Sequence, residues 1–128
     1  MNTKLLMTSS SLILGLAGIL ALFAPDALLS MLGAAGKPLT VLVQLMGALY
    51  FSFALMNWTA KDSAIGGVYA RPVSVGNFGH FFAGTLLLAK YQLSNELSLS
   101  VLTALVLYGI FAFCFYWLVF RSTGIKVN

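Results

Sequence analysis

The segment Leu39–Trp58, LTVLVQLMGALYFSFALMNW, contains no charged residue. A helix needs about 20 mainly apolar residues to cross the hydrocarbon core of a bilayer, which is about 30 Å thick, and this run has that length. Transmembrane β-strands are about 10 residues long and alternate in hydrophobicity, so the run argues against a barrel. The segment therefore predicts a membrane-spanning helix in an all-α membrane protein.

The composition of the whole chain indicates that lipid is its solvent. Of the 128 residues, 60% are hydrophobic and 8% are charged, and the mean hydropathy is +0.97. In soluble domains about 25% of the residues are charged. A chain this poor in charge could not cover its surface in water, so we expect the lipid bilayer as a partner. The formal net charge of +4 forms no basic stripe with interleaved aromatic residues, which argues against nucleic acid as a partner.

Three more apolar runs flank this segment, and the third run in the chain is shorter and more polar than the others. The first run resembles a signal peptide preceded by Lys4, but it is long and ends in a poor cleavage site, so we interpret it as a span. The connections are short enough to join neighbouring helices. We therefore expect one domain, residues 1–128, folded as an up-and-down four-helix transmembrane bundle. The expected spans are about 5–24, 39–58, 73–89 and 99–120.

The segment after the first run predicts a short helix at the membrane interface. Pro25 and Asp26 suit the start of a helix, and Gly33 suits its end. Its leucines fall on one face, as in helices that lie in the interface plane.

The basic residues predict the orientation of the chain. With four spans, the N-terminal end, the second connection and the C-terminal tail share one side of the membrane. That side carries Lys4, Lys61, Arg71, Arg121 and Lys126, and the other carries Lys37 and Lys90. The positive-inside rule then places both termini in the cytoplasm. We interpret Gly66–Gly67, in the second connection, as a turn rather than a hinge.

The third run holds the polar residues that could form a site. Arg71 precedes it, and Asn77 and His80 are three residues apart, on one face of a helix. Small residues beside them allow close helix packing, and polar side chains bond across such helices. We expect this polar group to meet Gln44 and Asn57 of the second run.

Each of these residues has a functional and a structural interpretation. His80 could be a proton relay, a general base or an axial haem ligand, or it could make an interhelical hydrogen bond. The three carboxylates of the chain all lie in connections or at span ends, which leaves a relay incomplete and favours the hydrogen bond. Arg71 could bind a lipid phosphate or an anionic substrate, or it could anchor the helix at the interface, which we favour. For Asn77 we favour helix packing.

The segments FAPDALLSMLG (23–33) and QLMGALYFSFALMNW (44–58) resemble small four-helix bacterial membrane proteins of the DoxX-like kind. There too, a first span ends in a Pro-containing segment and a glycine-bearing second span follows. The resemblance implies a bacterial inner-membrane protein, often an accessory subunit.

The sequence contains no metal-ligand spacing of His and Cys, no P-loop and no nucleophile elbow. We therefore predict no catalytic residues, no metal site and no cofactor. The leading hypothesis is a non-catalytic accessory or scaffold subunit, packed against its own copies or within a larger membrane complex. One alternative is a binder or carrier of a lipid-like or quinone-like molecule at the polar site of the third span. Another is an intramembrane enzyme that uses His80 as acid or base.

Overall fold

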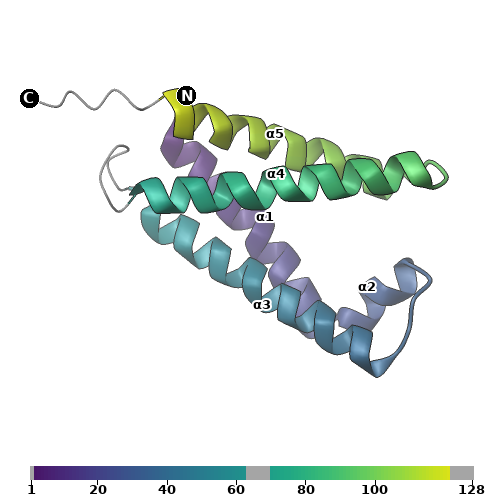
Figure 1. The fold of residues 1–128 in the computed structure, drawn as a ribbon. Helices are drawn as coiled ribbons and strands as arrows, with labels where there is room; N and C mark the ends of the chain where they lie inside the picture. The colour runs from purple at the N-terminus through teal and green to yellow at the C-terminus, as the bar shows by residue number, and fades with distance from the viewer. Residues whose placement is uncertain (1, 63–69, 122–128) are drawn as a thin grey trace, which may run out of the picture. The chain divides into compact units, whose positions relative to one another are not determined.

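The computed structural model describes residues 2–62 and 70–121, and this part of the chain is entirely helical apart from short connections (Figure 1). It contains five helices: α1 (Thr3–Phe23), α2 (Pro25–Met31), α3 (Lys37–Ala60), α4 (Ala70–Ser94) and α5 (Leu99–Arg121). The all-α class and the short helix after the first span are confirmed. Helix α4 extends beyond the predicted span 73–89 at both ends. The Gly66–Gly67 turn and Lys126 lie outside the described residues.

Three of these helices are long and apolar enough to cross a membrane, by length and composition: α1, α3, and α5 over Leu99–Phe120. The chain is therefore a small multi-pass membrane protein. In the described residues α4 is not among the three, although it has 25 residues. Its polar and charged side chains, among them Arg71, His80 and Lys90, lower its hydropathy.

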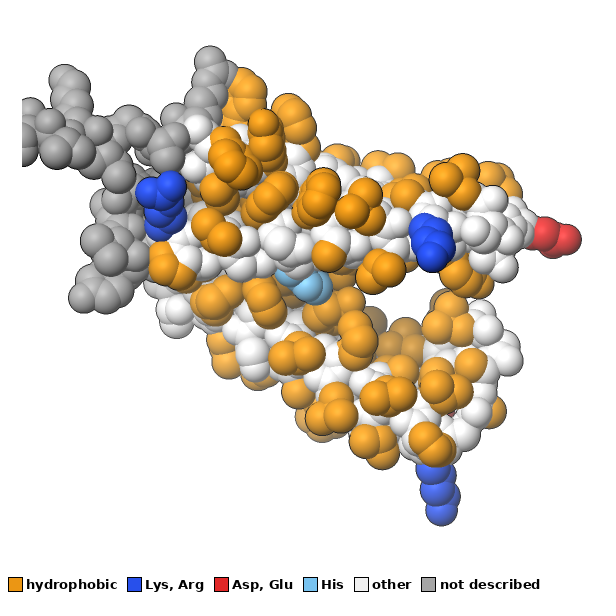
Figure 2. All heavy atoms as spheres, in the orientation of Figure 1, with side chains coloured by type: hydrophobic (Ala, Val, Ile, Leu, Met, Phe, Trp, Pro, Cys, Tyr) orange, Lys and Arg blue, Asp and Glu red, His pale blue; other side chains and the backbone are white. Residues whose placement is uncertain are grey.

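The helices group into two compact units, the N-terminal unit (Met1–Asp62) and the C-terminal unit (Ser63–Asn128). In the N-terminal unit, α1 packs along α3, and α2 contacts both. In the C-terminal unit, α4 packs along α5. Hydrophobic side chains are distributed over the helices of both units on the face in view in Figure 2, as expected for a surface solvated by lipid. A single domain over residues 1–128 stays a prediction.

Glycines bring α1 and α3 into backbone contact. A Cβ atom added to Gly18 would lie 2.7 Å from the backbone nitrogen of Phe51 and 2.8 Å from the carbonyl oxygen of Gly47. A Cβ atom added to Gly47 would lie 2.8 Å from the Cβ of Ala21. Lipid tails are as apolar as side chains, so helices in a bilayer associate through such close packing rather than through the hydrophobic effect. The two glycines therefore hold the N-terminal unit together.

Helix α2 ends as the sequence predicts. Gly33 has φ +66°, a left-handed conformation that favours glycine. The backbone N–H of Gly33 donates to the carbonyl of Ser30 (3.1 Å), and the N–H of Ala34 donates to that of Leu29 (2.9 Å), which is the Schellman arrangement. Leu29 is buried, whereas Leu32 is 71% exposed, so the leucine face is divided between core and surface.

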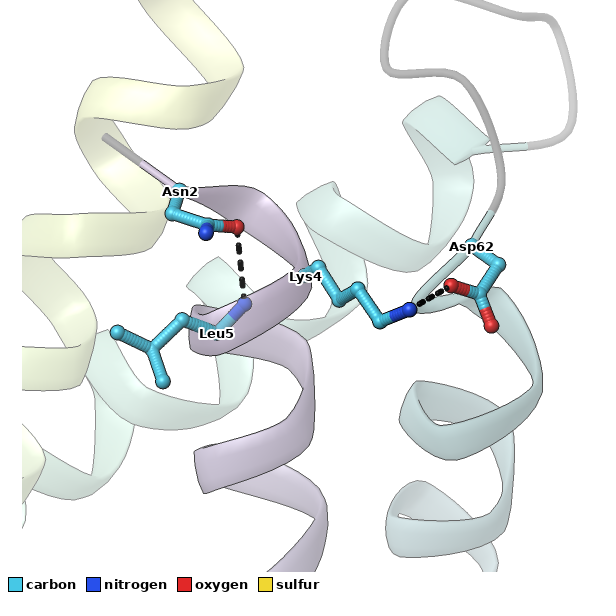
Figure 3. Close-up of polar contacts among 4 residues, drawn as sticks. All are labelled: Asn2, Lys4, Leu5 and Asp62. Atoms are coloured by element: carbon cyan, nitrogen blue, oxygen red, sulfur yellow. Dashed lines mark hydrogen bonds and ion pairs between the residues drawn. The ribbon is translucent and has the colours of Figure 1, made fainter.

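Polar contacts lie at the start of α1 and connect it to the end of α3 (Figure 3). The side chain of Asn2 accepts a hydrogen bond from the backbone N–H of Leu5 (3.2 Å) and so caps α1. The Nζ of Lys4 lies 2.7 Å from the Oδ1 of Asp62. This hydrogen bond from Lys4 lowers the pKa of the Asp62 carboxyl. Both side chains are exposed, so the pair contributes little stability, but it places the start of α1 beside the end of α3.

Candidate functional site

The polar residues predicted on the second span bond to α1 within the N-terminal unit. Asn57 is fully buried, and its Nδ2 donates to the Oγ of Ser10 (3.0 Å). Ser10 in turn donates to the carbonyl of Met7 (3.0 Å). The Nε2 of Gln44 donates to the carbonyl of Leu22 (3.2 Å). Both amides therefore fasten α3 to α1.

Sequence reasoning missed the serines that complete this contact. Besides Ser10, Ser11 is buried, and its Oγ donates to the carbonyl of Ala54 on α3 (2.7 Å). The run of three serines at 9–11, within an otherwise apolar segment, was the signal that could have found them. In a bilayer such hydroxyls add interhelical hydrogen bonds where water cannot compete.

In the C-terminal unit, the partner of His80 is Tyr108 of α5. The Nε2 of His80 lies 3.3 Å from the phenol oxygen of Tyr108, and the two ring centroids are 5.6 Å apart. Either the phenol donates to a bare Nε2 or a protonated Nε2 donates to the phenol oxygen, depending on the tautomer of the imidazole. Both side chains are half-buried. This pair is the interhelical hydrogen bond that the sequence favoured for His80, but its partner was not predicted.

Gly84 makes this pair sterically feasible. It lies one turn after His80 on the same helix face. A Cβ atom added to Gly84 would lie 2.5 Å from two ring carbons of Tyr108. The bare backbone thus lets the Tyr108 ring lie directly on α4, with its hydroxyl at the imidazole.

An aromatic core supports the pair from one side. Phe81 is fully buried, and its ring is stacked on Phe111 and Phe115, with centroid separations of 4.9 and 5.7 Å. It also meets the rings of Tyr108 (5.2 Å) and His80 (5.1 Å) edge to face. Such aromatic pairs add stability beyond their contact area. The position of Tyr108 is therefore fixed by packing as well as by its hydrogen bond.

The other two site residues predicted on α4 are Asn77 and Arg71. Asn77 is fully buried and its Nδ2 donates to the carbonyl of Val73 on its own helix (2.8 Å). Arg71 is exposed in the first turn of α4. A meeting of the α4 residues with Gln44 and Asn57 stays a prediction. Among the described residues, no group of three His, Cys, Asp or Glu side chains could hold a metal ion.

The chain shows no detectable similarity to a known protein family, to a curated protein or to a solved structure. The class that the helices themselves define is that of a small multi-pass membrane protein with three candidate spans. Its polar side chains connect α3 to α1 and α4 to α5.

Proposed function

We propose that α4 is a fourth span and that the chain is an up-and-down four-helix membrane protein with both termini in the cytoplasm. With 25 residues, α4 is about 37 Å long, more than the roughly 30 Å of the hydrocarbon core. It packs along the candidate span α5, and its histidine has a partner there. The short helix α2 lies at the interface in this arrangement, and its last residue, Met31, and the following Leu32 are both exposed.

Labelling of single cysteines in intact cells tests this topology. Cys114 is the single cysteine of the sequence and is first replaced by serine. In this Cys114→Ser background, we expect Ala35→Cys and Asn95→Cys to react with a membrane-impermeant maleimide added outside. Asn2→Cys and Asp62→Cys should react only after the cells are opened. Labelling of Ala35→Cys without labelling of Asn95→Cys would mean that α4 does not cross the membrane, and external labelling of Asn2→Cys would reverse the orientation.

We propose that the protein acts as a non-catalytic accessory or scaffold subunit, which packs against its own copies or a partner in the membrane. The observation that carries this proposal is that polar side chains of the chain form hydrogen bonds between helices. Asn57 and Gln44 donate to α1, and His80 is hydrogen-bonded to Tyr108. Polar groups that could have taken part in a reaction thus contribute to helix packing.

A second candidate function is supported by one specific contact, the pair formed by His80 and Tyr108. Two half-buried hydrogen-bonding groups stand beside the ring of Phe81. A quinone-like head group has carbonyl oxygens that accept hydrogen bonds and a flat ring that packs on aromatic side chains. The pair could therefore bind such a molecule rather than only join two helices.

Native mass spectrometry in a mild detergent, with an absorbance spectrum of the same sample, separates the two functions. For a scaffold subunit, we expect masses of the chain with its copies or a second polypeptide, and no discrete small ligand. His80→Gln and Tyr108→Phe should then leave assembly unchanged. A discrete added mass or absorbance band that both variants lose would instead favour the quinone-like ligand. Phe113→Ala, at a position 64% exposed on α5, serves as the control variant.

A further inference from the structure

The N-terminal unit contains an open hollow of about 480 Å³ between α2 and the first turns of α3. Asp26 lines it from α2, Gly36 from the connection, and Lys37, Thr40 and Val41 from α3. Helix α3 is a candidate membrane span that begins at Lys37. A hollow at the end of a span lies at the depth of the lipid head groups.

Two opposite charges face this hollow without neutralising each other. The Oδ1 of Asp26 accepts a hydrogen bond from the hydroxyl of Thr40 (2.8 Å), which fixes the carboxylate beside α3. Lys37 is exposed at the start of the same helix. Within residues 2–62, neither Asp26 nor Lys37 takes part in an ion pair. The hollow therefore offers a cation and an anion at two separate points.

An apolar surface continues from the hollow along α3. Val41, which lines the hollow, is 53% exposed; Leu42, the next residue, is 56% exposed, and Leu45, one turn after Val41, is 58% exposed. A molecule whose polar head filled the hollow could lay an acyl chain against these side chains.

We propose that this hollow binds the head group of a phospholipid in which a phosphate neighbours a primary ammonium, as in phosphatidylethanolamine. Lys37 faces the phosphate, and Asp26 accepts hydrogen bonds from the ammonium group. A choline head group has no N–H donor for Asp26, and a glycerol head group has no cation for it. The inference rests on the proposed placement of α3 in the membrane.

Competition between lipids tests the site. Delipidated full-length protein in detergent is mixed with equal amounts of phosphatidylethanolamine, phosphatidylcholine and phosphatidylglycerol, and the bound lipids are counted by native mass spectrometry. We expect about fivefold tighter binding of the ethanolamine lipid than of either rival, as an exposed charge pair allows. Asp26→Asn should remove this preference, because the amide can still accept from Thr40 but carries no charge. Lys37→Gln should weaken the binding of all three lipids, because each has a phosphate.

The control variant is Lys90→Gln, which removes a cation from the C-terminal unit that is not among the residues lining the hollow, and it should leave the preference intact. Equal binding of all lipids, unchanged in Asp26→Asn and Lys37→Gln, would overturn the proposal. Preference for phosphatidylglycerol would overturn it as well. O-phosphoethanolamine is added in a separate sample. If O-phosphoethanolamine binds through Asp26 and Lys37 although the protein prefers none of the three lipids, the site binds a soluble ligand and the lipid proposal is wrong. If the protein does not prefer the ethanolamine lipid although Ala35→Cys is labelled from outside, this site alone is overturned and the proposed topology stands.

Discussion

Replacement of Gly18 by leucine is expected to separate α1 from α3 and to lower the free energy of unfolding by about 3 kcal/mol or more. Even a Cβ atom at this position would lie within 2.8 Å of two backbone atoms of α3, the nitrogen of Phe51 and the carbonyl oxygen of Gly47. Backbone atoms cannot yield as the end of a flexible side chain can. The helices must therefore move apart, which also stretches the hydrogen bond from Ser11 to the carbonyl of Ala54.

Unfolding in mixed micelles with increasing SDS, followed by circular dichroism, measures this effect. Gly79→Leu is the matched control, because a Cβ atom at this helical glycine meets no heavy atom within 4 Å. Gly18→Ala should fall between the two. If Gly18→Leu proved as stable as Gly79→Leu, the close approach of α1 and α3 would be wrong.

Replacement of Phe81 by alanine should have the largest effect in the C-terminal unit. The Phe81 side chain is fully buried and touches rings on both helices, including Tyr108, Phe111 and Phe115. In water-soluble cores such a change costs about 3–5 kcal/mol, from lost transfer energy and from the cavity left behind. In lipid the transfer part is small because the unfolded reference is also apolar. We therefore expect a loss of about 2–3 kcal/mol, mainly from the cavity.

The same denaturation experiment measures this loss, with Phe113→Ala as its control. Phe113 lies on α5 but is 64% exposed, so its removal leaves no internal cavity. A second readout is the fluorescence of Trp117, whose ring contacts Phe113. Its emission should change more in the control Phe113→Ala than in Phe81→Ala. Equal stability of Phe81→Ala and Phe113→Ala would contradict the aromatic core of α4 and α5.

Much of the helical pattern followed from the sequence. The uncharged run Leu39–Trp58 predicted a span and lies within α3 (Lys37–Ala60). Pro25 and Gly33 predicted the start and the end of the short helix α2. The polar third run gave the least reliable bounds, because polar side chains at both ends of α4 hid the length of the helix from a search for apolar residues.

The candidate site could be predicted only in part. Gln44, Asn57 and His80 stood out because polar residues are rare in an apolar chain, and each bonds to a neighbouring helix. Tyr108 did not stand out, since an aromatic residue in the fourth run could equally face lipid. It is 28 residues from His80, and no spacing rule connects positions on two helices.

The sequence by itself determined which segments form helices, that three of them are long and apolar enough for a bilayer, and where the short helix stops. These properties depend on the hydropathy, length and turn residues of each segment alone. Only the tertiary structure decided that Asn57 meets Ser10 and that His80 meets Tyr108. Such pairs depend on the rotation and register of each helix, which are set by packing against its neighbour, as at Gly18 and Gly47 in one unit and at Gly84 in the other.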